Sequence, residues 1–471
     1  MSTLYVRRIL LFTIIVLLLS NCKEDSENQK QEGLQHPNII FLLTDDQRWD
    51  ALGYAGNQTL QTPNIDALAK NGVYFKNAYV TTSICAVSRA SILTGQYARR
   101  HQIWGFSKDF SEKQLNNTYP LLLRKSGYRT GFIGKYGVGH QLPKAKFDYW
   151  KGFPGQGTFT QKDSAGNAIY LTQKIGQQAS EFLELQKSSD KPFCLSVSFK
   201  APHVEGDPGY FLPNKIFDSL YRNTNVKVPK TSNSAYFDHF PKEFTENNVA
   251  RNRWKDRFAT PVMQQESIKK YYRLIHGVDV VVGDIVEKLK DTGQDKNTVI
   301  IFTSDNGFYL GEYGFAGKWY GSNPSIRIPM IIYDPRKKHK GIVIEKIALN
   351  IDLAPTILSI ANVDIPKIIQ GKDLTKLIDN PKTDWRDAFF YEHLWQSSNR
   401  YYIPSTEGVV CNDKKYMKYF RNENTEEVIF EELYDISEDP DEIKNLINVK
   451  GQETLKFQMK EQYEILKKEA H

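Results

Sequence analysis

"NIIFLLTDD", residues 38–46, is a run of apolar side chains that ends in two carboxylates, and "TVIIFTSDNG", residues 298–307, repeats this design. Continuous apolar runs of this length are typical of strands that are buried on both faces of a parallel sheet. Helical patterns lie between such runs, notably over residues 266–293, where apolar side chains recur at three- to four-residue spacing. The alternation predicts an α/β fold with a mostly parallel sheet between helices. Three further candidate strands are residues 130–135, 192–199 and 328–333.

The polar residues that follow the two runs indicate a metal site. Asp45 and Asp46 follow the first run, and Asp305 and Asn306 follow the second. Ligands of open α/β sheets bind beyond the carboxyl ends of the strands, where gathered carboxylates repel one another unless a cation joins them. Because every candidate ligand is an oxygen, a hard ion is expected, and Ca²⁺ tolerates an irregular site better than Mg²⁺. Either motif alone is explained by a strand-end turn, but their repetition favours the metal.

Cys85 stands out among the four cysteines. It lies in "SICAVSRASILTG", residues 83–95, at the expected start of a helix that Gly95 ends, with small polar residues and Arg89 around it. A structural cysteine is usually buried among apolar neighbours, so this pattern indicates a reactive position. The other cysteines are widely spaced and do not indicate a disulfide framework. They are Cys22, Cys194 and Cys411.

Five motifs in combination are typical of one enzyme family. They are "CAVSR" (85–89) with "TG" at 94–95, "TGFIGKYGVGH" (130–140), "APH" (201–203), "SDNGFYLGEYG" (304–314) and "GKWYGSNPSIRIPMII" (317–332). In these motifs, and from Pro37 to about residue 450, the chain resembles the formylglycine-dependent (type I) sulfatases of the alkaline-phosphatase superfamily, of the carbohydrate sulfatase type. The resemblance implies an alkaline-phosphatase-like large domain and a smaller α+β carboxy-terminal domain with an antiparallel sheet.

The resemblance also implies a role for each site residue. Cys85 would be oxidised to formylglycine, whose hydrated aldehyde offers one hydroxyl for attack on sulfur and a second that expels sulfate. A Ca²⁺ ion would be held by Asp45, Asp46, Asp305, Asn306 and the modified Cys85. Arg89 would hold the formylglycine hydroxyl and the carboxylates, Lys135 and Lys318 would bind sulfate oxygens, and His203 would protonate the leaving sugar oxygen.

Two positions depart from the family pattern. Val87 stands where the resemblance implies a proline that the maturation enzymes read, and a Cys85 that stays a thiol is the alternative outcome. Gly137 stands where the family has a histidine, which makes His140, the next histidine along, a weak catalytic candidate. Candidate residues at the rim of the site, for binding or stacking on a sugar, are His101, Trp319, Asn323 and His393.

The N-terminus resembles an export signal. Arg7 and Arg8 precede the apolar run of residues 9–19, which is about half the ~20 residues that a membrane span needs, and Cys22 follows as the residue that a lipoprotein would lipidate. Secretion with simple cleavage is the alternative. The protein is therefore expected to be exported, in the periplasm or as an outer-membrane-anchored lipoprotein of a Gram-negative bacterium.

The expected organisation has four parts: an export signal over residues 1–22, a polar linker over 23–36, the catalytic domain over 37–363 and the carboxy-terminal subdomain over 364–471. Strands are expected in "FFYEHLW" (389–395) and "KKYMKYF" (414–420), and a terminal helix over residues 451–471.

The predicted function is hydrolysis of sulfate esters on a carbohydrate such as ulvan, carrageenan or a glycosaminoglycan. The expected partners are this substrate and a formylglycine-generating enzyme. The protein is expected to contact the membrane only through an N-terminal lipid anchor. The net charge of +7 is spread along the chain, so no nucleic-acid partner is expected. The alternatives are a phosphodiesterase or phosphatase on the same scaffold and an inactive protein that binds sulfated glycans.

Overall fold

The computed structural model describes residues 36–471 apart from positions 164, 339, 395, 399–400 and 422–426. The predicted export signal, residues 1–22, and all but the last residue of the predicted linker lie outside the described residues. In the part of the chain that is described, no helix is both long and apolar enough to cross a membrane. Residues 38–471 form one compact unit, and the predicted division of this unit after residue 363 stays a prediction.

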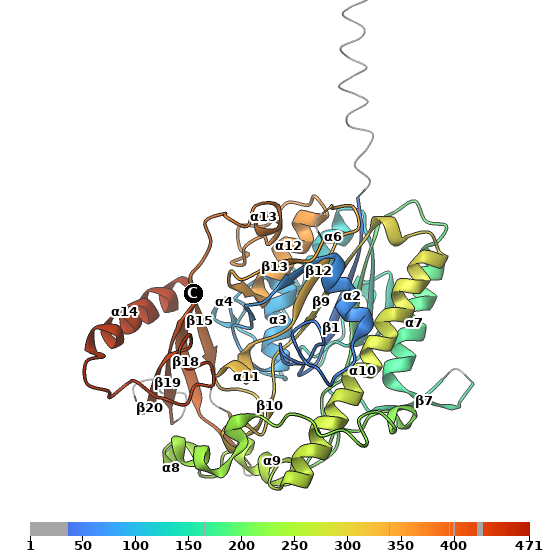
Figure 1. The fold of residues 1–471 in the computed structure, drawn as a ribbon. Coiled ribbons are helices and arrows are strands. Elements are labelled where there is room, and N and C mark those ends of the chain that lie inside the picture. The colour runs from blue at the N-terminus through green and yellow to red at the C-terminus, as the bar shows by residue number, and fades with distance from the viewer. Residues whose placement is uncertain (1–35, 164, 339, 395, 399–400, 422–426) are drawn as a thin grey trace, which may run out of the picture. The chain divides into compact units, whose positions relative to one another are not determined.

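A mixed eight-stranded sheet lies at the centre of this unit (Figure 1). Its strands are β1 (Asn38–Thr44), β2 (Val73–Phe75), β4 (Arg129–Lys135), β5 (Tyr149–Phe153), β8 (Phe193–Ser198), β9 (Thr298–Ser304), β12 (Met330–Tyr333) and β13 (Ile342–Ile344). Their order is β13-β2-β12-β9-β1-β8-β4-β5. The five consecutive strands β9, β1, β8, β4 and β5 are parallel, whereas β12 runs antiparallel to β9 and β2. All five predicted strands are confirmed.

Strand β1 carries five consecutive apolar residues, Ile39 to Leu43, and its packing explains why. Ile39, Phe41 and Leu43 belong to one hydrophobic core, and Ile40 and Leu42 belong to the other. Successive side chains of a strand point to opposite faces of the sheet. A strand that is covered on both faces therefore needs apolar residues at odd and at even positions. The first core includes α3 (Cys85–Thr94), α6 (Tyr119–Lys125) and α12 (Leu353–Ile360). The second includes α2 (Pro63–Asn71), α7 (Leu171–Gln186) and α10 (Pro261–Asp291) (Figure 1).

Helix α10 begins five residues before the start expected from its apolar spacing. Thr260 caps the helix, because its hydroxyl accepts a hydrogen bond from the backbone N–H of Met263 at 3.2 Å. Pro261 occupies the first helical position, where a missing N–H costs nothing. The first turn leaves its apolar Val262 73% exposed, so it does not continue the spacing of buried apolar residues that marks the rest of the helix.

The carboxy-terminal part contains the expected antiparallel sheet and helix. The sheet has the order β15 (Ala388–His393), β18 (Ser405–Cys411), β19 (Lys414–Phe420) and β20 (Val428–Asp435), and α14 (Glu453–Glu469) packs against it. One face of the sheet joins the first core through Phe389 and Met417. Tyr391 on β15 donates its hydroxyl to the carbonyl of Trp319 at 2.6 Å and accepts the N–H of Ser83 at 3.3 Å. The small sheet therefore supports two loops next to Cys85.

The remaining helices and strands are short. They are β3 (Ala78–Tyr79), α4 (Ala98–His101), α5 (Glu112–Leu115), β6 (Thr160–Lys162), β7 (Ala168–Tyr170), α8 (Lys242–Thr245), α9 (Val249–Arg257), β10 (Tyr309–Leu310), β11 (Ala316–Gly317), α11 (Asn323–Ile326), β14 (Ala348–Leu349), α13 (Thr375–Asp379), β16 (Gln396–Ser398) and β17 (Tyr401–Ile403).

Candidate active site

The two acidic strand ends lie side by side, as the sequence predicted. Strands β1 and β9 are paired in register up to Thr44 and Ser304, so the residues that follow them meet. The backbone N–H of Asp46 donates to Asp305 Oδ1 at 3.1 Å, and Asn306 Nδ2 donates to Asp46 Oδ1 at 2.6 Å. Asp46 has φ +70°, a left-handed conformation that a non-glycine residue adopts at a cost and that is common at functional sites.

Helix α3 brings Cys85 to these carboxylates. Cys85 is the first residue of the helix, Gly95 ends it with φ +66°, and every residue between them is buried. The Cys85 thiol donates to Asp45 Oδ1 at 3.2 Å. Burial, together with the charge of Asp45, raises the pKa of the Cys85 thiol to about 12. The unmodified thiol therefore stays protonated at neutral pH and is a poor nucleophile.

Arg89 lies one helical turn after Cys85 and connects three strands. Its Nε donates to Asp305 Oδ2 at 2.8 Å, and its Nη1 donates to the carbonyl of Lys135 at 2.8 Å and to Ser198 Oγ at 2.5 Å. A side chain on Gly137 would place its Cβ 2.7 Å from Arg89 Cδ. A histidine at position 137 would therefore displace Arg89, which explains why glycine, with φ +75°, stands there.

Two buried lysines neutralise two of the carboxylates. Lys135 Nζ is paired with Asp45 and also donates to Gln156 Oε1 at 2.7 Å. Lys318 Nζ is paired with Asp46 and lies 2.8 Å from Cys85 Sγ. Burial opposes the charged form of Lys318, but the surrounding acidic groups raise its pKa above the usual lysine value. The ammonium groups of Lys135 and Lys318 are thus held next to Asp45 and Asp46, respectively.

His203 completes the cluster. Its Nδ1 lies 2.6 Å from the carbonyl oxygen of Val204, which can only accept, so Nδ1 carries the hydrogen. Its Nε2 is then directed to the site, 3.7 Å from Asp46 Oδ2. Burial lowers the pKa of His203 to about 4, although Asp45 and Asp46 act in the opposite direction.

The oxygen-rich cluster has the donors that a hard cation needs. One ligand atom from each of four residues lies within 4.8 Å of the others, namely from Asp45, Asp46, Cys85 and Asp305. Asn306 Oδ1 is buried and has no hydrogen-bond partner among the described residues. A buried carbonyl oxygen without a donor is costly, and a cation would satisfy it. The residues that the sequence predicted as ligands therefore fit a divalent ion.

A cavity of about 580 Å³ opens above Cys85, His203 and Lys318. Sequence reasoning did not find Lys200 and Gln156 on its wall, or the residues of α9 that line it. Lys200 is buried and donates to Glu205 Oε2 at 2.7 Å; its position just before "APH" at the end of a strand was the available signal.

The weak candidate His140 is not brought to this cavity. It is exposed, does not line the cavity, and its backbone N–H donates to Asp109 Oδ1 at 2.7 Å. Of the rim candidates, Trp319 lines the cavity. The other three are buried elsewhere in the fold: His101 against Ser91, Asn323 against Lys415, and His393 in β15.

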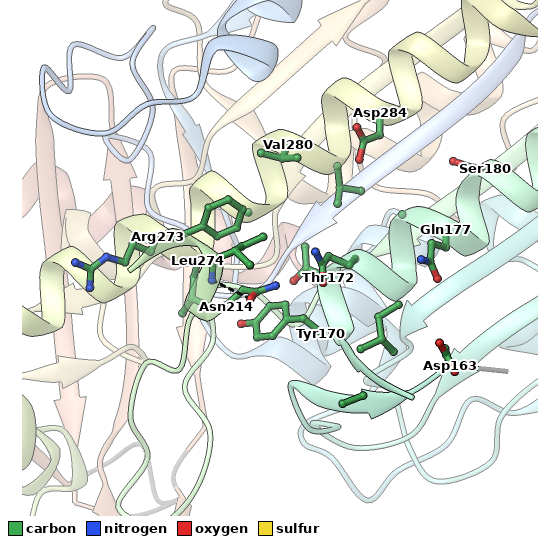
Figure 2. A pocket seen from close by; sticks show the side chains of 18 residues that line it. Asp163, Tyr170, Thr172, Gln177, Ser180, Asn214, Arg273, Leu274, Val280 and Asp284 are labelled. Atoms are coloured by element: carbon green, nitrogen blue, oxygen red, sulfur yellow. Dashed lines mark hydrogen bonds between the residues drawn. The ribbon is translucent and has the colours of Figure 1, made fainter. Parts of the chain in front are cut away.

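A larger cavity, of about 740 Å³, lies between α7 and α10 (Figure 2). None of its lining residues is a cysteine, histidine or lysine. Figure 2 shows Arg273 directed away from Asp163 and Asp284, and its guanidinium donates to the carbonyls of Leu220 and Asp218. This cavity therefore lacks the cysteine, histidine and lysine side chains that line the cavity above Cys85, which is the candidate active site.

The chain is similar to known sulfatases over most of its length. Residues 37–363 match the sulfatase family model, and residues 311–469 match the model of the C-terminal part of N-sulphoglucosamine sulphohydrolase. The chain is 29% identical to an N-acetylglucosamine-6-O-sulfatase of Bacteroides thetaiotaomicron, over 93% of this chain and 86% of that protein. It is 30% identical to an ulvan-active sulfatase of Formosa agariphila, over 78% of this chain and 70% of that protein.

Solved structures share the fold over nearly the whole chain. The structure of BT4656 in complex with its substrate D-glucosamine-2-N,6-O-disulfate has a TM-score of 0.78 and 26% identity, over 93% of this chain and 98% of that one. A phosphonate monoester hydrolase of Agrobacterium radiobacter has a TM-score of 0.76 and 20% identity, over 92% and 96%, which shows the fold alone. Because the sulfatase family model covers more than half of the sequence, this chain belongs to the sulfatase family of sulfuric ester hydrolases.

Proposed function

We propose that the protein removes sulfate from a sulfated carbohydrate, using a nucleophile made from Cys85 and a bound Ca²⁺ ion. The observation that carries this proposal is the position of Cys85 in the wall of the cavity, between Asp45 at 3.2 Å and Lys318 at 2.8 Å. Relatives named as N-acetylglucosamine-6-O-sulfatase and ulvan-active sulfatase support a carbohydrate substrate. The export signal and a maturation enzyme as partner remain part of the same proposal.

The high pKa of the Cys85 thiol supports its conversion to formylglycine. Burial and the charge of Asp45 raise the pKa of this thiol to about 12, so the thiol form dominates at neutral pH and is unsuited to attack on sulfur. A hydroxyl on the same carbon would lie against the carboxylate cluster. The backbone N–H groups of the first turn of α3 add a positive end at this point, which favours an anionic substrate.

The proposed Ca²⁺ ion would be held by the four acidic and amide side chains at the ends of β1 and β9 and by residue 85. When bound, it supplies positive charge that acidifies the nucleophile and offsets the charge of the sulfate. Asp45 and Asp46 would then be neutralised by the ion, and the ammonium groups of Lys135 and Lys318, which pair with these carboxylates in the structure, would be free to donate to sulfate oxygens.

Matched esters test the proposed function. Protein made together with a formylglycine-generating enzyme is expected to release sulfate from N-acetylglucosamine 6-sulfate faster than phosphate from the corresponding phosphate ester. Faster release of phosphate would identify a phosphatase on the same scaffold. Binding of the sulfated sugar without release of sulfate would identify an inactive glycan-binding protein.

His203→Ala is expected to lower kcat/KM for N-acetylglucosamine 6-sulfate by ~10²–10³-fold, because a sugar alkoxide leaves poorly without a proton. With the Nδ1 hydrogen held by the carbonyl of Val204, His203 can supply that proton from Nε2 only in its doubly protonated form, which a bound anionic sulfate ester favours. The loss is expected to be much smaller with nitrophenyl sulfate, whose leaving group is stable as an anion. His276→Ala, on α10 against the carbonyl of Gln61, is the matched control and should change neither rate. Equal losses with both esters would contradict the role of His203 as the acid.

A further inference from the structure

Arg257, the last residue of α9, lines the cavity above Cys85 but is itself only 2% exposed. Its Nε donates to the carbonyl of Gly209 at 2.5 Å and its Nη2 to the carbonyl of Pro208 at 2.6 Å. Its Nη1 has no hydrogen-bond partner, and its guanidinium has no carboxylate within ion-pair distance, among the residues that the structure describes. A buried guanidinium is therefore left with one donor unsatisfied and its charge unpaired.

The charge of Arg257 is correspondingly disfavoured. Burial and the nearby positive charge of Arg253 lower the pKa of Arg257 to about 9, against the weaker opposite effects of Asp256 and Asp46. Buried charges in proteins are normally paired with an opposite charge, because desolvation is otherwise too costly. The guanidiniums of Arg253 and Arg257 are neighbours, and Arg257 has no carboxylate paired with it among the described residues. An anionic ligand would stabilise this arrangement.

Arg253 extends the same surface toward the reacting centre. It lies four residues before Arg257 on α9, so both side chains project from one face of the helix, and both line the cavity. The Arg253 guanidinium lies 5.1 Å from the centroid of the Trp319 ring. Trp319 follows Lys318 directly and has φ +89°, a conformation that is held by the hydrogen bond of its carbonyl with Tyr391.

A purely structural role does not account for this arrangement. The carbonyls of Pro208 and Gly209 need two neutral donors, which an amide or hydroxyl would provide without burying a charge. The unsatisfied Nη1 and the second arginine, Arg253, add nothing to that task. Both features are explained when the cavity receives an anion beside the group that reacts at residue 85.

We propose that Arg257 and Arg253 form a second anion-binding subsite in this cavity, so that the preferred substrate carries a further sulfate or carboxylate besides the sulfate ester that is cleaved. This proposal rests on the proposed function in that the cavity is taken as the substrate site. The further anion is either a second sulfate on the same sugar or the carboxylate of an adjoining uronic acid. Asp256, which also lines the cavity, is left to bind sugar hydroxyls.

The test measures binding and turnover separately. Three probes are used: N-acetylglucosamine 6-sulfate, glucosamine-2-N,6-O-disulfate, and a disaccharide in which a uronic acid is linked to N-acetylglucosamine 6-sulfate. Titration calorimetry on Cys85→Ala protein, which cannot turn the esters over, is expected to show at least ~10-fold tighter binding of one of the two doubly charged probes. The probe that gains identifies the source of the second anion. The same preference is expected in kcat/KM of the mature wild-type enzyme.

Charge variants locate the subsite. Arg253→Gln and Arg257→Gln are each expected to reduce the preference for the doubly charged probe several-fold. If Arg257→Gln loosens the loop at Pro208, Arg253→Gln still tests the subsite. Lys255→Gln removes the same charge from an exposed position on α9 that does not line the cavity, and should leave the preference unchanged. Equal binding of all three probes, or a preference that survives both arginine variants, would overturn the proposal. Preferential binding without sulfate release by the wild-type protein would instead overturn the proposed function and leave the subsite standing.

Discussion

Replacing Cys85 with alanine is expected to lower kcat/KM for a sulfated sugar by at least ~10⁴-fold, because removal of a covalent nucleophile leaves only binding and electrostatic stabilisation. The variant should remain folded, since α3 is held by its apolar contacts and alanine removes only the contacts of Sγ with Asp45 and Lys318. Sulfate release and thermal unfolding, measured on the same preparation, separate the two effects.

The matched control is Cys411→Ala, which removes a half-buried thiol on β18 that lies 3.9 Å from Met459 Sδ. It should keep wild-type activity.

Mass spectrometry of the peptide that contains Cys85, from protein made with a maturation enzyme, is expected to show the aldehyde in place of the thiol. A fully active enzyme with an intact thiol would rule out formylglycine. An inactive protein with an intact thiol would mean that Val87 prevents maturation.

Removing divalent cations is expected to stop sulfate release while leaving the protein folded. The reason is the pairing of Lys135 with Asp45 and of Lys318 with Asp46, which neutralises both carboxylates without an ion. Adding Ca²⁺ should restore activity and raise the melting temperature, because an ion that binds only the folded state stabilises it by about 2.7 kcal/mol at 100 times its Kd. Mg²⁺ should stabilise less, since it demands a more regular site.

The ligand variant for this experiment is Asp305→Ala, which is expected to remove most of the stabilisation by Ca²⁺. Asp190→Asn, in the exposed segment before β8, removes a carboxylate from outside the cluster and should leave the stabilisation intact. Unfolding of the wild-type protein by a chelator alone would contradict the compensating role of the lysines. A melting temperature that rises with Zn²⁺ but not with Ca²⁺ would contradict the predicted hard-ion site.

The central strands could be predicted because burial on both faces of the sheet requires a continuous apolar run, which is a local pattern in the sequence. The central positions of β1 and β9 are apolar because helices cover both faces of the sheet, and such runs are visible without knowing the partner strands. The direction of β12 could not be predicted in the same way. Its four residues are equally apolar in either direction, and the path of the preceding chain decides that it pairs antiparallel with β9.

The candidate site likewise contains residues that the sequence could predict and residues that it could not. Motif residues such as Asp45, Cys85 and His203 were found because each stands next to a strand end or helix start that the sequence displays. Arg257 was missed, because in sequence it is one of several charged residues in the polar segment "RNRWKDR", where arginines are usually solvated. Its burial follows from how α9 packs over the loop at Pro208 and Gly209, which are nearly fifty residues away along the chain.

By itself, the sequence determined the layered α/β architecture, the family and the set of groups that gather at the ends of β1 and β9. These depend on local patterns: apolar runs, helix ends and the residues beside them. Only the tertiary structure decided which charges are paired, that Lys135 and Lys318 neutralise the carboxylates, that His140 stays outside the cavity, and that Arg257 is buried without a counter-charge. Pairing and burial are set by segments that meet across hundreds of residues, and no local pattern encodes the distance between two such segments.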